Sequence, residues 1–143
     1  MITLVLDASV ALKWAIPAAT EPLAAESLRL LKRHSNGEIE FIVPDVFWAE
    51  VGNVMWKGSQ RARWSRSDAE RAVRDMQARD FVTVPSQPLL SEALDIAFAY
   101  DRGVYDCLYA ALAFASKADL VTADERLVNS LAARFPVRWL GVF

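Results

Sequence analysis

The stretch Ile2-Thr3-Leu4-Val5-Leu6-Asp7-Ala8-Ser9-Val10-Ala11-Leu12-Lys13-Trp14 begins the chain and decides its fold class. Its first five apolar or β-branched residues predict a buried strand over residues 2–6. The residues after Asp7 carry apolar side chains at helical spacing, which predicts a helix over residues 8–15. A buried strand that leads directly into a helix is typical of a parallel sheet covered by helices.

The same alternation of short apolar runs and longer helix-period segments continues through all 143 residues, without an internal repeat or a linker-like segment. We therefore expect one domain, residues 1–143, of the α/β class, with a mostly parallel central sheet of about five strands flanked by helices. Ser67 and Glu70 have the spacing of a capping box at the start of one helix. The expected strands lie near residues 2–6, 40–43, 81–84, 119–122 and 137–140, and the expected helices near residues 8–15, 21–35, 45–59, 67–79, 88–102, 106–117 and 124–134.

The composition narrows the class of protein. The single cysteine, Cys107, excludes an internal disulfide and fits a reducing cytoplasm. The longest apolar stretch, residues 107–115, is shorter than the ~20 residues of a membrane-spanning helix, so we expect a cytoplasmic protein without membrane contact. The net charge of −2 is unusual for a protein that coats nucleic acid. Residues 57–79 are nevertheless locally basic, which indicates either a surface that follows a phosphate backbone or a solvated helix face with ion pairs.

Four acidic residues stand near the expected junctions between strands and helices: Asp7, Glu50, Asp106 and Asp124. The carboxyl ends of parallel strands are where ligands bind, so acids from distant parts of the chain can meet there. Crowded carboxylates repel each other by about 4 kcal/mol per pair at ~4 Å and an effective dielectric constant near 20. Mg²⁺ or Mn²⁺ relieves this repulsion. The pattern therefore predicts a divalent metal site of the kind that hydrolyses phosphodiesters.

Each acid alone also has a structural explanation. Asp7, Asp106 and Asp124 could cap helices or stabilise a first helical turn. Glu50 is harder to explain in this way, because Val46 and Val54 place it on the apolar side of its helix. Buried carboxylates are rarely left without a partner.

Four segments, read in order, closely resemble the PIN-domain family and, within it, the VapC-type toxins of bacterial and archaeal toxin–antitoxin pairs. They are Asp7-Ala8-Ser9-Val10-Ala11-Leu12-Lys13-Trp14, Glu50-Val51-Gly52-Asn53 after Val43-Pro44, Tyr105-Asp106-Cys107-Leu108-Tyr109-Ala110-Ala111-Leu112-Ala113, and Val121-Thr122-Ala123-Asp124-Glu125-Arg126-Leu127. The resemblance covers essentially the whole chain.

The resemblance implies a metal-dependent endoribonuclease that is the toxin of a type II toxin–antitoxin system. Its acidic cluster would consist of Asp7, Glu50, Asp106 and Asp124, with Mg²⁺ or Mn²⁺ as the cofactor. Ser9 and Thr122 match hydroxyl positions that line this pocket, although Thr122 and Glu125 also spell a capping box. The implied partners are an RNA substrate, a cognate antitoxin protein and a second copy of the chain in a homodimer.

Within this cluster, position suggests different roles. Asp7 and Asp106 are expected to bind metal directly. Glu50 either binds metal or orients the attacking water, and Asp124 acts through water or on a second ion.

Aromatic residues near the expected helix ends are candidates for stacking unpaired RNA bases: Trp14, Trp56, Trp64 and Tyr105. Packing in the core or against a partner is the alternative for each of them, and it is favoured for Trp56. A receiver-type phosphorylation domain of similar size is excluded, because only Asp7 follows the first strand and residues 139–143 contain no lysine. The remaining alternative is a PIN-like module that binds RNA or protein without catalytic turnover.

Overall fold

Five strands form one sheet in the order β3-β2-β1-β4-β5, and every neighbouring pair is parallel. The computed structural model describes residues 1–16 and 21–143. The strands are β1 (Ile2–Leu6), β2 (Ile39–Pro44), β3 (Val82–Val84), β4 (Asp119–Thr122) and β5 (Val137–Trp139). The expected α/β class and parallel sheet are confirmed, and the strand bounds differ from expectation by no more than one residue at either end.

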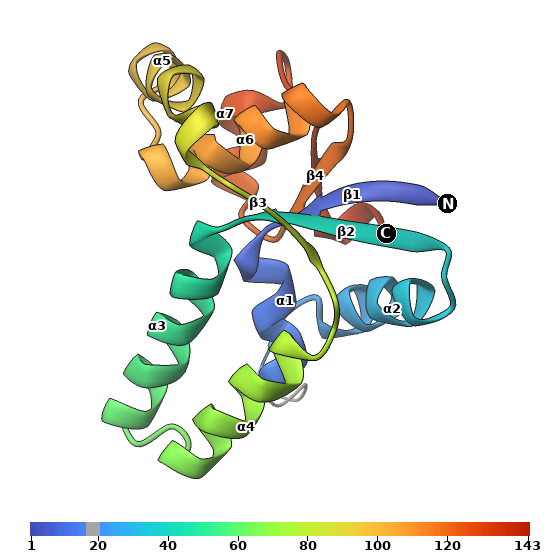
Figure 1. The fold of residues 1–143 in the computed structure, drawn as a ribbon, viewed down its shortest axis with the longest axis vertical. Helices are drawn as coiled ribbons and strands as arrows, with labels where there is room; N and C mark the ends of the chain where they lie inside the picture. Colours follow the sequence, from blue (N-terminus) through green and yellow to red (C-terminus); the bar gives the residue numbers. More distant parts are fainter. Residues whose placement is uncertain (17–20) are drawn as a thin grey trace.

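Helices cover both faces of this sheet, α5, α6 and α7 on one side and α1, α2 and α3 on the other (Figure 1). Their bounds are α1 (Ala8–Ala15), α2 (Ala24–Ser35), α3 (Val46–Gln60), α4 (Arg66–Gln77), α5 (Leu90–Tyr100), α6 (Val104–Ser116) and α7 (Glu125–Leu131). A 3₁₀ turn, Gln87–Leu89, takes the first residues of the helix expected over 88–102. The expected capping box at Ser67 is wrong, because Ser65 caps α4 and its hydroxyl accepts a hydrogen bond from the Asp68 amide at 3.0 Å.

The strand order changes direction at β1, which lies between β2 and β4. After β1 the chain adds β2 and then β3 on one side of β1, and it later adds β4 and then β5 on the other side. A crevice forms at the carboxyl ends of strands at such a switch point. Val5 and Val121, in the two central strands, are fully buried because helices cover the sheet on both sides. The Asp7 amide donates to the Val121 carbonyl at 3.1 Å, which ties the ends of β1 and β4 together.

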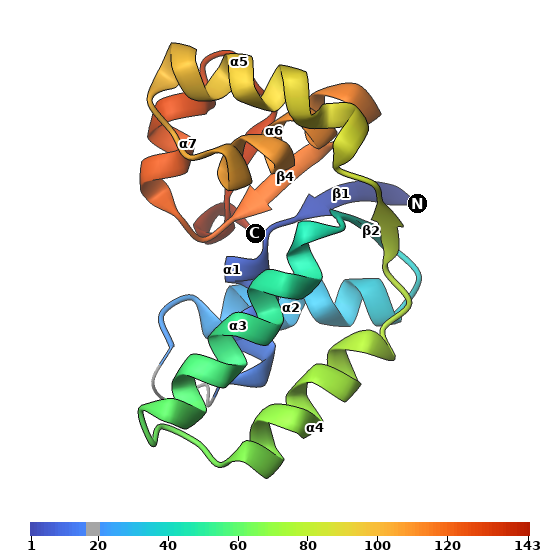
Figure 2. The same cartoon turned by 60° about the vertical axis from the view of Figure 1, so that its left-hand side comes forward.

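Helices α3 and α4 form a hairpin that extends away from the sheet (Figure 2). The Trp64 indole packs so closely on α3 that a Cβ atom at Gly58 would lie 1.8 Å from its ring. Its Nε1 donates to the Met55 carbonyl at 2.8 Å. The locally basic segment lies on this hairpin, where Arg66 pairs with Glu70 at 2.6 Å. That pair is typical of a solvated helix face with ion pairs.

Within the described ranges, no helix combines the length and apolar character needed to cross a membrane. Cys107 is a free thiol buried in α6.

Candidate active site

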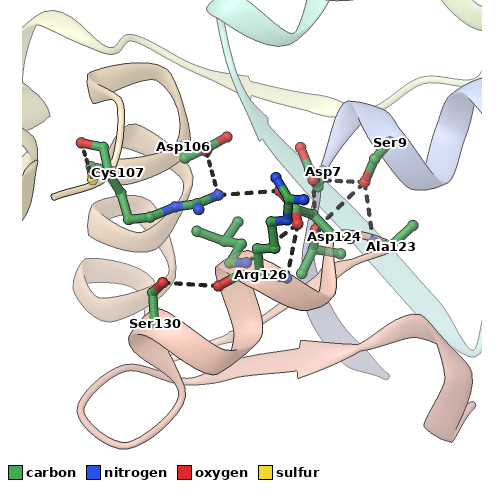
Figure 3. A network of polar contacts seen from close by, with 11 residues as sticks. Asp7, Ser9, Asp106, Cys107, Ala123, Asp124, Arg126 and Ser130 are labelled. Atoms are coloured by element: carbon green, nitrogen blue, oxygen red, sulfur yellow. Dashed lines mark hydrogen bonds and ion pairs between the residues drawn. The ribbon is translucent and has the colours of Figure 1, made fainter. Parts of the chain in front are cut away.

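The four acids of the sequence pattern lie at the carboxyl end of the sheet, around the switch point. Asp7 directly follows β1, and Asp124 follows its parallel neighbour β4 after one intervening residue. Glu50 lies in the second turn of α3, and Asp106 lies in the first turn of α6. Asp106 and Asp124 each raise the pKa of Asp7, so the three carboxylates are within electrostatic range of one another. Figure 3 shows these three side chains facing a common space.

Two hydroxyl groups hold the buried carboxylate of Asp7, which is only 6% exposed. Ser9 Oγ and Thr122 Oγ1 both donate to Asp7 Oδ2, each at 2.7 Å (Figure 3). Each hydroxyl in turn accepts a backbone N–H, from Ala123 to Ser9 and from Asp124 to Thr122, both at 3.1 Å. The hydroxyl protons must therefore point at Asp7. Both bonds end on Oδ2, and Oδ1 accepts no hydrogen bond from the residues that the structure describes.

These contacts distinguish between the two roles expected for Thr122, a hydroxyl in the acidic pocket and a helix cap. The amino end of α7 is capped by Asp124, whose Oδ1 accepts hydrogen bonds from the amides of Arg126 at 3.0 Å and Leu127 at 3.4 Å. Thr122 faces Asp7 instead, so its capping-box alternative is wrong. Asp7 occupies the cap position of α1 but makes no capping hydrogen bond with its side chain. Asp106 lies inside α6 rather than at its cap, which is Gly103.

An arginine that the sequence pattern did not include joins two of the acids. Arg102 Nη2 lies 3.2 Å from Asp106 Oδ2 and 3.2 Å from Asp124 Oδ2. Arg102 stands in the short link between α5 and α6, after Asp101, whose φ of 54° turns the chain sharply. The signal that could have found it is its spacing of four residues from Asp106, which is an ion-pair distance on a helix.

Glu50 is a partly buried carboxylate in an unusual environment. Its Oε1 is buried without a hydrogen-bond partner among the described residues, and so is the Tyr109 hydroxyl. Burial, with smaller contributions from Asp7 and Asp106, raises the pKa of Glu50 to about 7. The Tyr109 hydroxyl offsets part of this rise by its proximity, although the two groups do not reach normal hydrogen-bond geometry. Tyr109 was likewise not expected from the sequence.

The surroundings of Asp7 and Asp106 also disfavour the charged form of the carboxylate. Burial is the main cause that raises the pKa of Asp7, and the Ser9 and Thr122 hydroxyls counteract it. Burial also raises the pKa of Asp106, against the lowering effect of Arg102. A nearby cation would reverse these shifts, because it favours the charged carboxylates.

The donor set fits a hard divalent cation, since it consists of carboxylate and hydroxyl oxygens. The unpartnered Glu50 Oε1 and the free Oδ1 of Asp7 are the atoms that such an ion would satisfy. As they stand, however, no three acidic, histidine or cysteine side chains in residues 1–16 and 21–143 converge closely enough to hold a metal ion. A hard ion such as Mg²⁺ can bind through one or two carboxylates and several waters, and Arg102 stands between two of the acids concerned.

The aromatic candidates separate into two groups. Trp14 packs against Phe41 and Phe81, and Trp64 packs on Gly58, so both belong to the framework. Trp56 is 58% exposed, so core packing is wrong for it, and packing against a partner stays a prediction. Tyr105 is 66% exposed and, with Glu50, lines a cavity of about 540 Å³ between α3 and α6.

Comparison with known proteins identifies related chains. The model of the PIN domain family matches residues 4–130. Similar solved structures include PAE2754 from Pyrobaculum aerophilum, with a TM-score of 0.74 and 22% identity over 99% of this chain and 85% of that one. VapBC2 from Rickettsia felis, bound to a DNA fragment from its promoter, has a TM-score of 0.64 and 12% identity over 96% and 98% of the two chains.

A toxin–antitoxin complex from Klebsiella pneumoniae has a TM-score of 0.63 and 14% identity over 94% of each chain. At these identities the three structures show a shared fold. Curated protein sequences give no match.

Proposed function

Because the chain belongs to the PIN-domain family, we propose that it is a metal-dependent endoribonuclease that hydrolyses RNA phosphodiester bonds. The observation that carries this proposal is the arrangement around Asp7. Two oriented hydroxyls fix one of its oxygens and leave the other free, next to Glu50 with an unpartnered buried oxygen. A site that served only to stabilise the fold would satisfy these polar atoms internally.

Each acid has a role that follows from its surroundings. Asp7 is the most rigid member and presents Oδ1 as a direct ligand of Mg²⁺ or Mn²⁺. Asp106 and Asp124 hold charge at the opposite side of the site. When bound, a divalent ion activates a water and neutralises charge that develops on the phosphate. Glu50 either joins the ligands or orients the attacking water, whose proton its carboxylate can accept.

Single-stranded or looped RNA is the proposed form of the substrate. Tyr105 is exposed beside the Glu50 cavity, where its ring can stack on an unpaired base next to the scissile phosphate. Such stacking contacts stabilise binding by about 1–3 kcal/mol per base.

The chain is proposed to act in the cytoplasm as a VapC-type toxin that a cognate antitoxin holds inactive. Two of the structural neighbours are described as VapBC2 and as a toxin–antitoxin complex. The partner would lay an apolar helix along the groove of about 690 Å³ between α3 and α4, where Trp56 is exposed beside Met55 and Val73. This is the helix-in-groove mode of recognition.

A homodimer is the proposed assembly state. Leu90, Leu94 and Phe98 recur every four residues on α5 and are all exposed, which gives an apolar stripe for a second copy. Light scattering after size-exclusion chromatography should give twice the mass of 15.9 kDa. Phe98→Asp should return the protein to the monomer.

The function is tested by incubation of the purified protein with structured RNA, with Mg²⁺, with Mn²⁺ and with a chelator. We expect cleavage with either ion and none with the chelator. RNA binding without cleavage under any of these conditions would favour the alternative, a PIN-like binding module without turnover.

A further inference from the structure

We propose that Arg102 is a built-in counter-ion that competes with the divalent cation for Asp106 and Asp124, and so sets how tightly the site binds metal. The inference rests on the proposed function, because it concerns the same carboxylates. It adds a residue that neither the acid pattern nor the family match assigns.

The position of the guanidinium is the first observation. A single nitrogen, Nη2, lies 3.2 Å from one carboxylate oxygen of Asp106 and 3.2 Å from one of Asp124. No other lysine or arginine in the described residues forms an ion pair with any of the four acids. The guanidinium therefore supplies positive charge at the place where two carboxylates would otherwise repel each other.

The incomplete satisfaction of this arginine is the second observation. The Arg102 side chain is only 19% exposed, and its Nε is buried without a hydrogen-bond partner among the described residues. Arginine has five N–H donors in a fork that can pair with both oxygens of a carboxylate. Here both ion pairs use the same nitrogen, so the guanidinium makes fewer contacts than it could make elsewhere.

The attachment of Arg102 to the fold lets the side chain move while its backbone stays fixed. Asp101 before it holds a left-handed conformation, and Gly103 after it is the N-cap of α6. The Cys107 thiol donates to the Arg102 carbonyl, with Sγ 3.8 Å from the oxygen (Figure 3). The long side chain can leave the two carboxylates by rotation about its own bonds.

Together these observations define a competition. Asp106 and Asp124 exchange the single positive charge of the guanidinium, which each of them contacts, for a doubly charged ion, and Arg102 must leave for the exchange to occur. Removal of the guanidinium should therefore strengthen metal binding. The net charge near the site becomes more negative by one unit, and the two carboxylates also lose their competing partner. A positive charge nearby that made no contact with these carboxylates would change metal affinity much less.

The test measures binding of Mn²⁺ alone to the purified protein by titration calorimetry near pH 7.5. We expect Arg102→Gln to bind Mn²⁺ about tenfold more tightly than the wild type, which corresponds to about 1.4 kcal/mol. At one fixed Mn²⁺ concentration, the ion should then raise the melting temperature of Arg102→Gln by more degrees than that of the wild type.

The matched control is Arg126→Gln. Arg126 is exposed on α7, two residues after Asp124, and it forms no ion pair with the residues that the structure describes. The substitution removes the same charge from the same neighbourhood, and it keeps the backbone amide of residue 126, which donates to Asp124 Oδ1. We expect its Mn²⁺ affinity to change by less than about threefold, because exposed charges are screened by solvent.

A second variant covers the case in which Arg102→Gln does not fold. Arg102→Lys keeps the charge but has a compact ammonium group on a shorter side chain, and it should bind Mn²⁺ with an affinity between those of the wild type and Arg102→Gln. If the Arg102 variants bind Mn²⁺ as tightly as the wild type or more weakly, the proposed competition is wrong, while the proposed metal site stands. A wild type that binds no Mn²⁺ at all would overturn both proposals.

Discussion

Thr122 Oγ1 donates to Asp7 Oδ2 at 2.7 Å, across 115 positions of sequence. The contact is possible because β1 and β4 are adjacent and parallel, so that both residues leave the sheet at the same edge. Thr122 is fully buried and also accepts the Asp124 amide at 3.1 Å. One hydroxyl thus connects two of the four acids and fixes the orientation of the Asp7 carboxylate.

Thr122→Val tests this connection, since it removes the hydroxyl and keeps the shape of the side chain. The Asp124 amide loses its acceptor and Asp7 loses one of two donors, so the free energy of unfolding should fall by about 1–3 kcal/mol. RNA cleavage should fall by about 10–100-fold, as for other contacts that orient metal ligands. Urea unfolding and initial cleavage rates measure the two effects.

Thr3→Val is the matched control for Thr122→Val. Thr3 lies in β1, and its hydroxyl makes no hydrogen bond with the described residues. Its replacement should leave the cleavage rate unchanged. Equal loss of activity in both variants would argue against a specific role for the Thr122 hydroxyl.

Asp7→Asn should separate catalysis from folding. The carboxylate is buried near Asp106 and Asp124, and burial raises its pKa, so its charge destabilises the metal-free fold. The variant should therefore keep or increase its melting temperature without metal. RNA cleavage should disappear, a larger loss than the roughly 10–100-fold expected for a supporting contact.

Circular dichroism and a cleavage assay on the same Asp7→Asn sample provide the measurement. A sharp drop in the melting temperature of the metal-free variant would instead assign Asp7 a structural role. Retained cleavage would contradict its place in the proposed site.

Gly58→Ala should destabilise the α3–α4 hairpin. The added Cβ would lie 1.8 Å from the Trp64 ring, so the indole must move and its hydrogen bond to the Met55 carbonyl is strained. Overpacking of this kind lowers stability by about 1–3 kcal/mol. Gly52→Ala is the control in the same helix, because nothing lies within 4 Å of its added Cβ.

Gly52→Ala should stabilise the protein by about 0.5–1 kcal/mol through helix propensity. Thermal unfolding of the two variants should therefore shift in opposite directions. Equal shifts would show that the Gly58–Trp64 contact does not limit packing of the hairpin.

The sequence was sufficient to predict the fold and the edge of the sheet where the acids gather. Asp7 and Asp124 each follow a strand closely, and strand ends can be read from local apolar runs. In a parallel sheet all these ends lie at the same edge, so local patterns determine which residues share a region. Glu50 was predicted from a different pattern, because a carboxylate on an apolar helix face is costly to bury without a partner.

Arg102 could not be predicted in the same way. Its contact with Asp124 depends on the angle between α5 and α6, which the left-handed turn at Asp101 helps to set. Nothing in the local pattern at Asp101 specifies that conformation. The sequence likewise did not show which of Trp56 and Trp64 is packed. The Trp64 indole packs against Gly58, whereas the Trp56 indole is exposed.

The dependence of stability on pH offers a test of Glu50 without any substrate. Its pKa rises from 4.5 to about 7 in the folded protein, mainly through burial. Between these two values the folded state holds a proton that the unfolded state has lost, so stability falls as the pH rises. The stabilising contribution is full below pH 4.5 and is lost as the pH passes through about 7.

Glu50→Gln removes this titration. Compared with the metal-free wild type, the variant should become relatively more stable as the pH is raised from about 5 to about 8. Glu125→Gln removes an exposed carboxylate from α7 and controls for the change in net charge. Melting temperatures over this pH range give the comparison.

Saturating Mn²⁺ should abolish the fall in wild-type stability that the Glu50 titration causes as the pH rises, because a bound cation favours the charged carboxylate and replaces its proton. Titration calorimetry near pH 6 in buffers of different ionisation enthalpy should then detect proton release on Mn²⁺ binding by the wild type and less release by Glu50→Gln. If the two proteins release the same number of protons, Glu50 does not exchange its proton for the metal. Glu50 would then be left with the role of orienting the attacking water.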